Sequence, residues 1–523
     1  MEQSSRNPGE LTVGDIVVDN ALRHPDVVAY RHKQRVLTHR ELRERAERLV
    51  SALMAAGVAR QDRIAVYSRN SIEFGEITAA TQLSGIILAA INFRSSPVEV
   101  EDALDRVRPA VIFVAAEFAG VLDELSPQLT WSPLIVCIGA RRSSLVDYED
   151  FIDSAPARQP LHRARADDIA CLLFTSGSTG PSKCCVLGQR ELRRVLYAMN
   201  AEMATGSHDR GLINMPMCHV GALGIIGGLH ARGGTVVLQD QFDIAGAVQL
   251  AATERISVLH LAPVMLQALL EALPDGSRAL ESVRTVVYSA APMNGATLAR
   301  AMAVMPQAGF LNLYGQTEAI VSGLPRELHD PEATDNRLRS VGYPFPGVRV
   351  RIVGDDGQDV NPGSPGEIVV QSDALFRGYW DDAAATLATL RDGWCHTGDV
   401  GRFDERGLLY LVDRKKDVII TGGENVYSPE VENAIGELPE VAGCAVVGVP
   451  DPRWGEAVCA VVVPRPGATV TLEQLQAAVR LSLAGYKVPR RLVVATELPV
   501  LASGKFDKKR LRTELAAYGN QAS

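Results

Sequence analysis

A run of glycine, serine and threonine precedes a lysine in the segment FTSGSTGPSKCCV, residues 174–186. This composition predicts a turn whose backbone N–H groups and hydroxyls wrap phosphate oxygens. A P-loop NTPase needs Ser or Thr directly after the lysine to hold magnesium, whereas Cys184 follows Lys183 here. The spacing argues against an ordinary P-loop. A phosphate-binding turn and a serine-rich surface turn both stay open at this point.

Six further segments carry polar residues in a fixed order: PMCHVGA (216–222), YSAAP (288–292), YGQTEA (314–319), GWCHTGDVG (393–401), DRKKDVIITGGENVYSPEVE (413–432) and LASGKFDKKRLR (501–512). Together with the loop, they resemble the core motifs of the adenylate-forming superfamily. That superfamily includes acyl-CoA synthetases, the adenylation domains of peptide synthetases and firefly luciferase. The resemblance extends over almost the whole chain, so chance would require several independent coincidences.

The resemblance implies an acyl-CoA synthetase that uses ATP, Mg²⁺ and CoA. Carboxylic acids titrate at about pH 4, so the substrate is ionised at neutral pH and needs no general base. It would attack the α-phosphorus and expel pyrophosphate, and the acyl group would then pass to CoA. The protein would supply alignment and charge neutralisation. The loop would therefore hold the β and γ phosphates as the leaving group.

The nucleotide contacts implied by the resemblance come from Thr175, Ser176, Gly177, Ser178, Thr179, Gly180, Lys183, Ser289, Ala290, Ala291, Pro292, Tyr314, Gly315, Thr317, Asp399 and Arg414. Tyr314 would stack on adenine, and Thr317 would donate to the α-phosphate. Glu318 would bind magnesium, because a hard cation that bridges phosphates prefers a carboxylate. Asp399 would accept hydrogen bonds from both ribose hydroxyls with Arg414 beside it, although an isolated Asp in such a sequence is more often a turn residue.

The residues predicted to act in catalysis are Lys505, Glu318, Thr317 and His219. Lys505 matches the lysine of the family's C-terminal G-K motif, which pairs with the incoming carboxylate and the α-phosphate. Composition alone favours a solvated tail lysine, since the surrounding tail is rich in Lys and Arg. His219 resembles a family position at the acyl entrance, where it would gate the pocket. A lone histidine is otherwise more often structural.

A rotation of the small domain between the two half-reactions is also implied by the resemblance. Lys416 matches the family's hinge position, and a hinge is a few residues that absorb a dihedral change. Gly422, Gly423 and Glu424 match the segment that meets the pantetheine arm of CoA, and the glycines allow close backbone approach. The alternative for this segment is an ordinary tight turn.

The elements that must position these residues alternate helix-like stretches with short apolar runs from about residue 37 to 309. This alternation predicts an α/β fold with doubly wound parallel sheets. One helix is expected over residues 39–57, with Gly57 as its C-cap before the strand RIAVYS. A Gly- and Pro-rich segment at about 340–411 predicts a β-barrel-like subdomain. The helical patterns SPEVENAIGEL and TLEQLQAAVRLSLAG, with two apolar strands, predict a small α+β unit after it.

We therefore expect an N-terminal adenylation domain over 1–414 and a mobile C-terminal domain over 415–523. The formal charge of −9 argues against nucleic acid as a partner. No transmembrane segment or secretory signal is visible. Eight scattered cysteines without a C-x-x-C pair suit reduced thiols and a cytoplasmic location. The oligomeric state, including a homodimer, is left open.

The loop departs from the common family form, because Ser182 and Cys184 stand where most members have Pro and Gly around the lysine. The adjacent Cys184 and Cys185 are expected to be buried rather than catalytic. CoA is favoured as acceptor, with a carrier protein or a partner enzyme as the alternative. A non-catalytic nucleotide- or acyl-binding protein is the rival of another class.

The expected substrate is an apolar acid, either fatty, alicyclic or aromatic. The suspected pocket segments LGIIGGL, VLHLAP and YSAAPM carry no acidic residue that could hold an amino-acid ammonium group.

Overall fold

The computed structural model describes residues 11–142, 145–155, 163–175, 182–274, 276–330, 332–333, 335–500 and 506–519. These residues divide into two compact units. The first contains the chain up to Thr175, Lys183–Arg349 and Val370–Cys395. The second contains Val350–Val369 and the chain from His396 onward. The division therefore runs through the β-rich segment that the sequence predicted.

One sheet of the first unit has seven strands, in which every pair is parallel except β8–β9. Its order is β7 (Val146–Asp147), β6 (Leu134–Ile138), β5 (Val111–Ala115), β3 (Arg63–Tyr67), β4 (Ile87–Ile91), β8 (Ile169–Thr175) and β9 (Lys183–Gly188). All five residues of β4 are buried, as expected for a parallel strand with both faces covered. β8 and β9 bracket the predicted phosphate loop.

A second sheet of the same unit has nine strands. Its order is β16 (Tyr343–Pro344), β15 (Ile320–Leu324), β14 (Gly309–Gly315), β13 (Thr285–Ser289), β12 (Val258–Leu261), β10 (Arg210–Ile213), β11 (Thr235–Leu238), β1 (Val28–His32) and β2 (Arg35–Thr38). The strands from β14 to β1 are parallel, and the pairs at both edges are antiparallel. The carboxyl ends of the parallel strands thus share one edge.

The helices of the first unit are α1 (Gly14–Arg23), α2 (His39–Ala55), α3 (Ile72–Ser84), α4 (Pro97–Val107), α5 (Ala119–Leu125), α6 (Tyr148–Asp153), α7 (Gln189–Met203), α8 (Val220–His230), α9 (Ile244–Thr253), α10 (Pro263–Ala272), α11 (Gly295–Val304) and α12 (Ala383–Thr389). Thr38 and Glu41 form a capping box at the start of α2. After α2 ends, Gly57 has a φ of +86°. The predicted helix and its glycine stop are confirmed.

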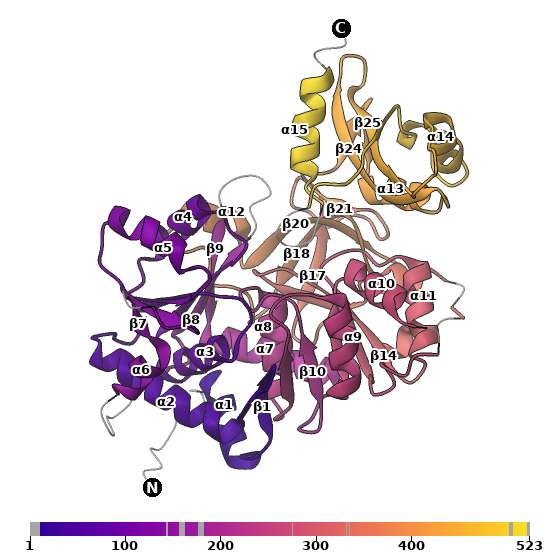
Figure 1. Cartoon of the computed structure of the whole chain (residues 1–523). Coiled ribbons are helices and arrows are strands. Elements are labelled where there is room, and N and C mark those ends of the chain that lie inside the picture. The colour runs from indigo at the N-terminus through magenta and orange to yellow at the C-terminus, as the bar shows by residue number, and fades with distance from the viewer. Residues whose placement is uncertain are drawn as a thin grey trace. The chain divides into compact units, whose positions relative to one another are not determined.

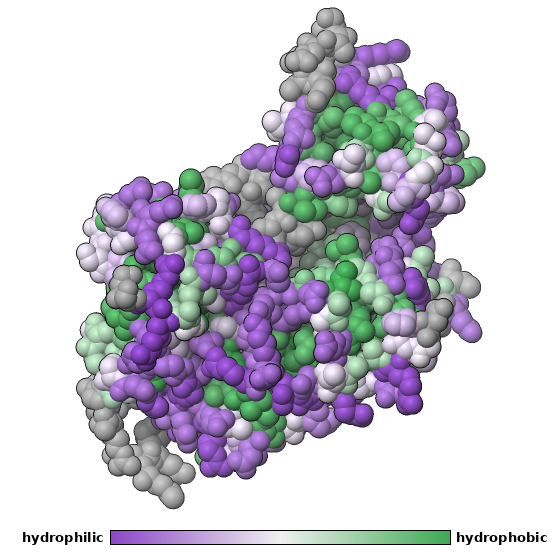
Figure 2. All heavy atoms as spheres, in the orientation of Figure 1, coloured by the Kyte–Doolittle hydropathy of each residue, from purple (hydrophilic) through white to green (hydrophobic). Residues whose placement is uncertain are grey.

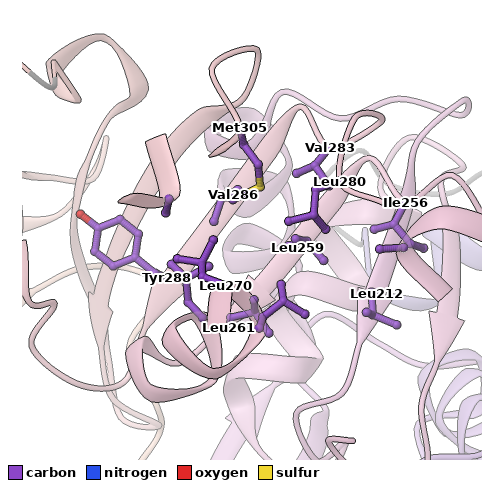
Figure 3. Close-up of a cluster of buried hydrophobic side chains, with 14 of the residues drawn as sticks. Leu212, Ile256, Leu259, Leu261, Leu270, Leu280, Val283, Val286, Tyr288 and Met305 are labelled. Atoms are coloured by element: carbon purple, nitrogen blue, oxygen red, sulfur yellow. The ribbon is translucent and has the colours of Figure 1, made fainter. Parts of the chain in front are cut away.

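The nine-stranded sheet buries one face against α9, α10 and α11 (Figure 3). Leu259 and Leu261 of β12 and Val286 and Tyr288 of β13 point into this cluster. Because successive residues of a strand point to opposite faces, the residues between them, including His260, point to the other face. This alternation decides which side chains lie on the face of the sheet opposite the cluster.

The β-rich segment forms a five-stranded sheet. Its order is β17 (Arg349–Val353), β18 (Gly366–Gln371), β20 (Trp394–Phe403) and β19 (Leu390–Arg391), with β21 (Leu409–Arg414) paired to β20. A second five-stranded sheet follows, in the order β23 (Glu424–Val426), β22 (Ile419–Thr421), β25 (Gly455–Pro464) and β24 (Val441–Asp451), with β26 (Arg491–Val494) paired to β25.

The helices of the C-terminal region are α13 (Ser428–Gly436), α14 (Leu472–Arg480) and α15 (Lys508–Gly519). Successive residues of β24 and β25 point to opposite faces, so these helices pack on two different sides of the strands. Val446 and Val458 lie in the cluster with α13 and α14, whereas Val447 and Cys459 pack against Leu511 of α15. Figure 1 shows these helices on opposite sides of β24 and β25.

The predicted α/β class, with a large parallel-sheet part and a smaller C-terminal part, is confirmed. Within the described ranges, no helix is long and apolar enough to cross a membrane. Figure 2 shows hydrophilic side chains over much of the visible face of the first unit, with apolar residues dispersed among them.

Candidate active site

The segment YGQTEA forms the tip of the β14–β15 hairpin. Gln316 and Ala319 exchange backbone hydrogen bonds with N···O distances of 2.8 and 3.2 Å. A Cβ atom at Gly315 would lie only 2.8 Å from the Ala319 carbonyl oxygen, so a residue without a side chain is required there. Thr317 and Glu318 lie in the turn itself, and Glu318 is 7% exposed. Glu318 is therefore a buried turn residue.

Glu318 lies in a cluster with Tyr379 and Lys183, which come from distant parts of the sequence. The Tyr379 hydroxyl donates to Glu318 Oε1 at 2.7 Å, and Lys183 Nζ lies 4.6 Å from the centre of the Tyr379 ring. Burial, and next the Glu318 carboxylate, raise the pKa of Tyr379, so its hydroxyl stays protonated and donates. An ammonium group is attracted to an aromatic face. The predicted phosphate-binding lysine is thus placed beside the predicted magnesium ligand.

The backbone around β9 builds this cluster. Residues 376–380 run along the edge of β9, with the Trp380 N–H donating to the Cys184 carbonyl at 2.7 Å. The same segment reaches the hairpin tip, where the Phe376 N–H donates to the Glu318 carbonyl at 2.9 Å. Sequence reasoning missed Tyr379, because FRGYW has no motif spacing that would mark it. Only the pairing of this segment with β9 brings it to Glu318.

The two adjacent cysteines of β9 are both fully buried. Burial raises the pKa of Cys184 to about 12. Burial, and next the Glu318 carboxylate, also raise the pKa of Cys185. Both thiols therefore stay protonated at neutral pH, and a protonated thiol is a poor nucleophile. They fill space in the sheet as small apolar side chains do.

The YSAAP segment begins at the carboxyl end of β13. Ser289 is the last residue of the strand, and its Oγ lies 2.9 Å from His260 Nε2. Ala290 has a φ of +74°, a left-handed conformation that costs a non-glycine residue about 1–2 kcal/mol. Ala291 and Pro292 are exposed. The chain thus turns sharply at Ala290, as strained backbone often does at functional sites.

Two further predicted residues lie at element ends. His219 is the N-cap residue of α8, and burial, with Arg94 next, lowers its pKa to about 4. Its Nε2 is buried and has no hydrogen-bond partner among the described residues. At the end of β8, the Thr175 hydroxyl donates to the Lys183 carbonyl at 3.3 Å, which closes the base of the loop. Ser176, Gly177, Ser178, Thr179 and Gly180 lie outside the described residues.

The predicted ribose-binding pair lies in the second unit. Asp399 and Arg414 are directly opposite each other in the β20–β21 ladder. Arg414 Nε lies 3.3 Å from Asp399 Oδ1, and the Asp399 side chain is 11% exposed, against 42% for Arg414. The positive charge of Arg414 therefore compensates the negative charge of the mostly buried Asp399 carboxylate. Lys416, the predicted hinge residue, is exposed two residues later.

The predicted pantetheine segment is the turn between β22 and β23. Gly422 and Gly423 have φ values of +61° and +84°, which is the pattern of a two-residue hairpin turn that glycine favours. Glu424 pairs with Thr421 across the turn and is exposed. A side chain on Gly422 would come within 3.0 Å of the Trp454 ring. Lys505, the predicted catalytic lysine, lies outside the described residues.

The chemistry of Glu318 fits a magnesium ion bound mainly through phosphates. In the part of the chain that the structure describes, no group of three or more His, Cys, Asp or Glu residues could hold a metal by itself. Mg²⁺ on a nucleotide needs only one or two protein carboxylates, because water and phosphate oxygens supply its other ligands. A single buried carboxylate, with one oxygen held by Tyr379, meets that requirement.

Comparison with known proteins gives matches over nearly the whole chain. A family model described as AMP-binding enzyme matches residues 17–380, and one described as AMP-binding enzyme C-terminal domain matches residues 430–505. A feruloyl-CoA synthase from an Amycolatopsis species is 35% identical over 508 residues, covering 97% of this chain and 99% of the relative.

Two other relatives support the match. A fatty acid–[acyl-carrier-protein] ligase from Streptomyces coeruleorubidus is 32% identical and covers 94% of both chains. The structure of ATP-bound MatB from Rhodopseudomonas palustris superimposes with a TM-score of 0.88 at 26% identity, covering 97% of this chain and 100% of the other. The chain therefore belongs to the AMP-binding enzymes, the adenylate-forming superfamily that its motifs resemble.

Proposed function

We propose that the chain is an AMP-forming acid–thiol ligase. It activates a carboxylic acid with ATP to an acyl-adenylate, releases pyrophosphate, and transfers the acyl group to CoA to give acyl-CoA and AMP. The observation that carries this function is the full-length match to AMP-binding enzymes, with a feruloyl-CoA synthase at 35% identity. Its cofactors are ATP, Mg²⁺ and CoA as co-substrate.

The proposed centre of the first half-reaction is the cluster of Lys183, Tyr379 and Glu318. Lys183, together with Thr175 and the loop up to Gly180, binds the leaving β and γ phosphates. Glu318 binds the magnesium ion, and Tyr379 fixes the carboxylate through its 2.7 Å hydrogen bond. These groups hold phosphates and neutralise charge, which is the main contribution of a protein to phosphoryl chemistry.

The remaining roles follow the motif positions. The proposed adenine and α-phosphate contacts are Ser289, Ala290, Ala291, Pro292, Tyr314, Gly315 and Thr317. The ribose contacts are Asp399 and Arg414, supported by their 3.3 Å ion pair. Lys505 pairs with the reacting carboxylate, His219 lies at the acyl entrance, and Lys416 is the hinge. Gly422, Gly423 and Glu424 meet the pantetheine arm, supported by the sharp glycine turn.

We propose a catalytic N-terminal domain over 1–414 and a mobile C-terminal domain over 415–523. The two family models, which end at 380 and begin at 430, support a boundary in this interval. A cytoplasmic location is supported by the free cysteines among the described residues. The formal charge of −9 supports the absence of a nucleic-acid partner. A homodimer is the assembly to test by light scattering.

The proposed substrate class is an apolar carboxylic acid, either fatty, alicyclic or aromatic. The pocket segments carry no acidic residue, and a relative with the name feruloyl-CoA synthase supports an aromatic acid. The test is ATP/pyrophosphate exchange against a panel of acids, followed by addition of CoA to each positive reaction. Lys505→Ala is expected to abolish exchange, whereas Lys509→Ala, which removes an exposed lysine of the same tail, is the matched control.

Exchange followed by acyl-CoA formation would support the ligase. A second candidate acceptor is a carrier protein, favoured by the relative named fatty acid–[acyl-carrier-protein] ligase. In that case exchange is retained, CoA gives no thioester, and a phosphopantetheinylated carrier protein is acylated. If no acid supports exchange, the non-catalytic binding protein becomes the better explanation.

A further inference from the structure

Three segments, VLHLAP, PMCHVGA and YSAAPM, meet at His260 of β12. The Ser289 hydroxyl, from YSAAPM, lies 2.9 Å from His260 Nε2. Gly221, from PMCHVGA in the first turn of α8, faces the same ring. A methyl group on Gly221 would have one heavy atom nearby, His260 Cε1 at 3.5 Å. The fold thus brings the His260 imidazole to the place where these segments meet.

The strand register explains why the imidazole faces α8. His260 pairs with Val287 across β12 and β13, while its neighbours Leu259 and Leu261 point into the core cluster on the opposite face (Figure 3). Ser289 lies two residues after Val287 and therefore shares its face. On that face, a Cβ on Gly211 would collide with Leu229 of α8. The His260 ring therefore lies between the sheet and α8.

One nitrogen of this ring has no hydrogen-bond partner among the residues that the structure describes. His260 is 2% exposed, and its Nδ1 is buried without a hydrogen bond to any described residue. Buried polar atoms are almost always paired, because an unpaired one loses its hydrogen bond to water without replacement. Beside the ring, Gly221 carries no side chain, and apart from its own helix the only described atom within 4 Å of the position that its Cβ would take is His260 Cε1. A buried polar atom that no described residue pairs, on a ring beside a residue without a side chain, is what a site for a ligand's polar group requires.

The ring is also uncharged. Burial lowers the pKa of His260 to about 4, so the neutral imidazole carries one proton at pH 7. If the Ser289 hydroxyl donates to Nε2, Nδ1 carries the proton and pairs with a carbonyl oxygen. If Nε2 donates to Ser289, Nδ1 accepts from a hydroxyl group. A neutral imidazole offers no positive charge to a second carboxylate, which argues for an uncharged group.

We propose that His260, oriented by Ser289, hydrogen-bonds through Nδ1 to a hydroxyl or carbonyl group of the acid other than the reacting carboxylate. The enzyme then selects an otherwise apolar acid that carries one such group over its unsubstituted analogue. His260 is the specificity-determining residue, and Ser289 is a positioning residue. This inference rests on the proposed function and narrows its substrate class.

The test is ATP/pyrophosphate exchange by the full-length enzyme with matched pairs of acids. The pairs are phenylacetate and hydroxyphenylacetate, cinnamate and hydroxycinnamate, and octanoate with its hydroxy and oxo derivatives at several positions. For at least one pair we expect kcat/KM to favour the substituted acid by about tenfold to hundredfold, because the analogue leaves Nδ1 unpaired. A preference for the oxo acid would indicate that Nδ1 carries the proton, and a preference for the hydroxy acid would indicate that Nε2 carries it.

The variants test the residue rather than the fold. His260→Leu is expected to reduce the preference to about onefold, because it lowers kcat/KM for the substituted acid more than for the unsubstituted one. Because Ser289 is also a proposed nucleotide contact, Ser289→Ala is judged by the ratio between the two acids at saturating ATP, and this ratio is expected to fall. His260→Gln is expected to retain part of the preference, because its side-chain amide can still form a hydrogen bond. His329→Leu is the matched control, since His329 is a partly buried histidine whose ring bonds Tyr288 Oη and the Pro325 carbonyl, both at 2.9 Å. It should leave the preference unchanged.

Two outcomes overturn the inference while exchange itself is intact. One is a wild-type enzyme that prefers no substituted acid. The other is a His260→Leu variant that lowers kcat/KM equally for both members of each pair, which assigns His260 to the reacting carboxylate or to the fold. Absence of exchange with every acid refutes the proposed function itself, and the inference with it. The two failures are therefore distinguishable.

Discussion

Replacing Tyr379 with Phe removes one hydroxyl group from the Lys183–Tyr379–Glu318 cluster and leaves the aromatic ring under Lys183. The lost contact is the 2.7 Å hydrogen bond to Glu318 Oε1. A hydrogen bond to a charged group contributes about 1.5–3 kcal/mol. Since about 1.4 kcal/mol corresponds to a factor of ten in rate, we expect kcat/KM for Mg·ATP to fall by about 10-fold to 150-fold. Removal of a group that orients a metal ligand typically lowers metal affinity or activity by about 10-fold to 100-fold.

The assay is ATP/pyrophosphate exchange at saturating acid, with ATP and Mg²⁺ varied independently. The expected change is a higher Mg²⁺ concentration for half-maximal rate and an unaltered KM for the acid, because Tyr379 orients the metal ligand only. Tyr148→Phe is the matched control. Its hydroxyl donates at 2.8 Å to Glu76, a fully buried carboxylate elsewhere in the first unit. That variant should lose stability without a change in Mg²⁺ dependence.

The reasoning would be refuted by one combination of results. If Glu318→Gln abolishes exchange while Tyr379→Phe keeps the wild-type Mg²⁺ dependence, the hydroxyl does not orient the metal ligand. A change in Tyr148→Phe equal to that in Tyr379→Phe would attribute the effect to general destabilisation. Circular dichroism of each variant separates a folding defect from a local one.

Three further predictions concern other parts of the chain. Asp399→Asn should raise the KM for ATP about tenfold or more by removing a charged acceptor, and it should shrink the preference for ATP over deoxyATP; an unchanged preference would contradict the ribose contact. Burial lowers the pKa of His39 to about 4 and that of His230 to about 3, both below the unfolded value of about 6.5. The unfolded chain therefore binds more protons as pH falls from about 6.5 to 4, so the free energy of unfolding should fall in this window by up to about 1.4 kcal/mol per pH unit for each histidine. Urea denaturation at several pH values measures this loss, and His230→Gln should flatten it. Because burial raises the pKa of Cys185, iodoacetamide at pH 8 should leave the native activity unchanged, and rapid inactivation protected by ATP would show that a thiol of the site is accessible.

The local elements were largely predictable from the sequence, because their signals are local. The helix over 39–57 ends where the glycine predicts, since Gly57 takes the left-handed conformation that stops α2. The helix predicted over 471–485 is shorter in the structure, and α14 ends at Arg480. Leu481 is 90% exposed, so the apolar pattern beyond Arg480 does not mark a buried helical face. The periodicity of a sequence shows only which residues are apolar. Whether those residues are buried depends on the elements that pack against them.

The sequence by itself determined the family, the order of the motifs and the residue types in each motif, because these follow from the order of residues along the chain alone. It did not reveal Tyr379 or the environment of His260. Tyr379 meets Glu318 across 61 positions, and His260 meets Ser289 across 29. The first contact depends on the bridge between Tyr379 and Cys185 of β9. The second depends on the register of β12 and β13, since a one-residue shift would turn His260 to the opposite face. Strand order and register are set by packing of the whole sheet, so only the tertiary structure could decide them.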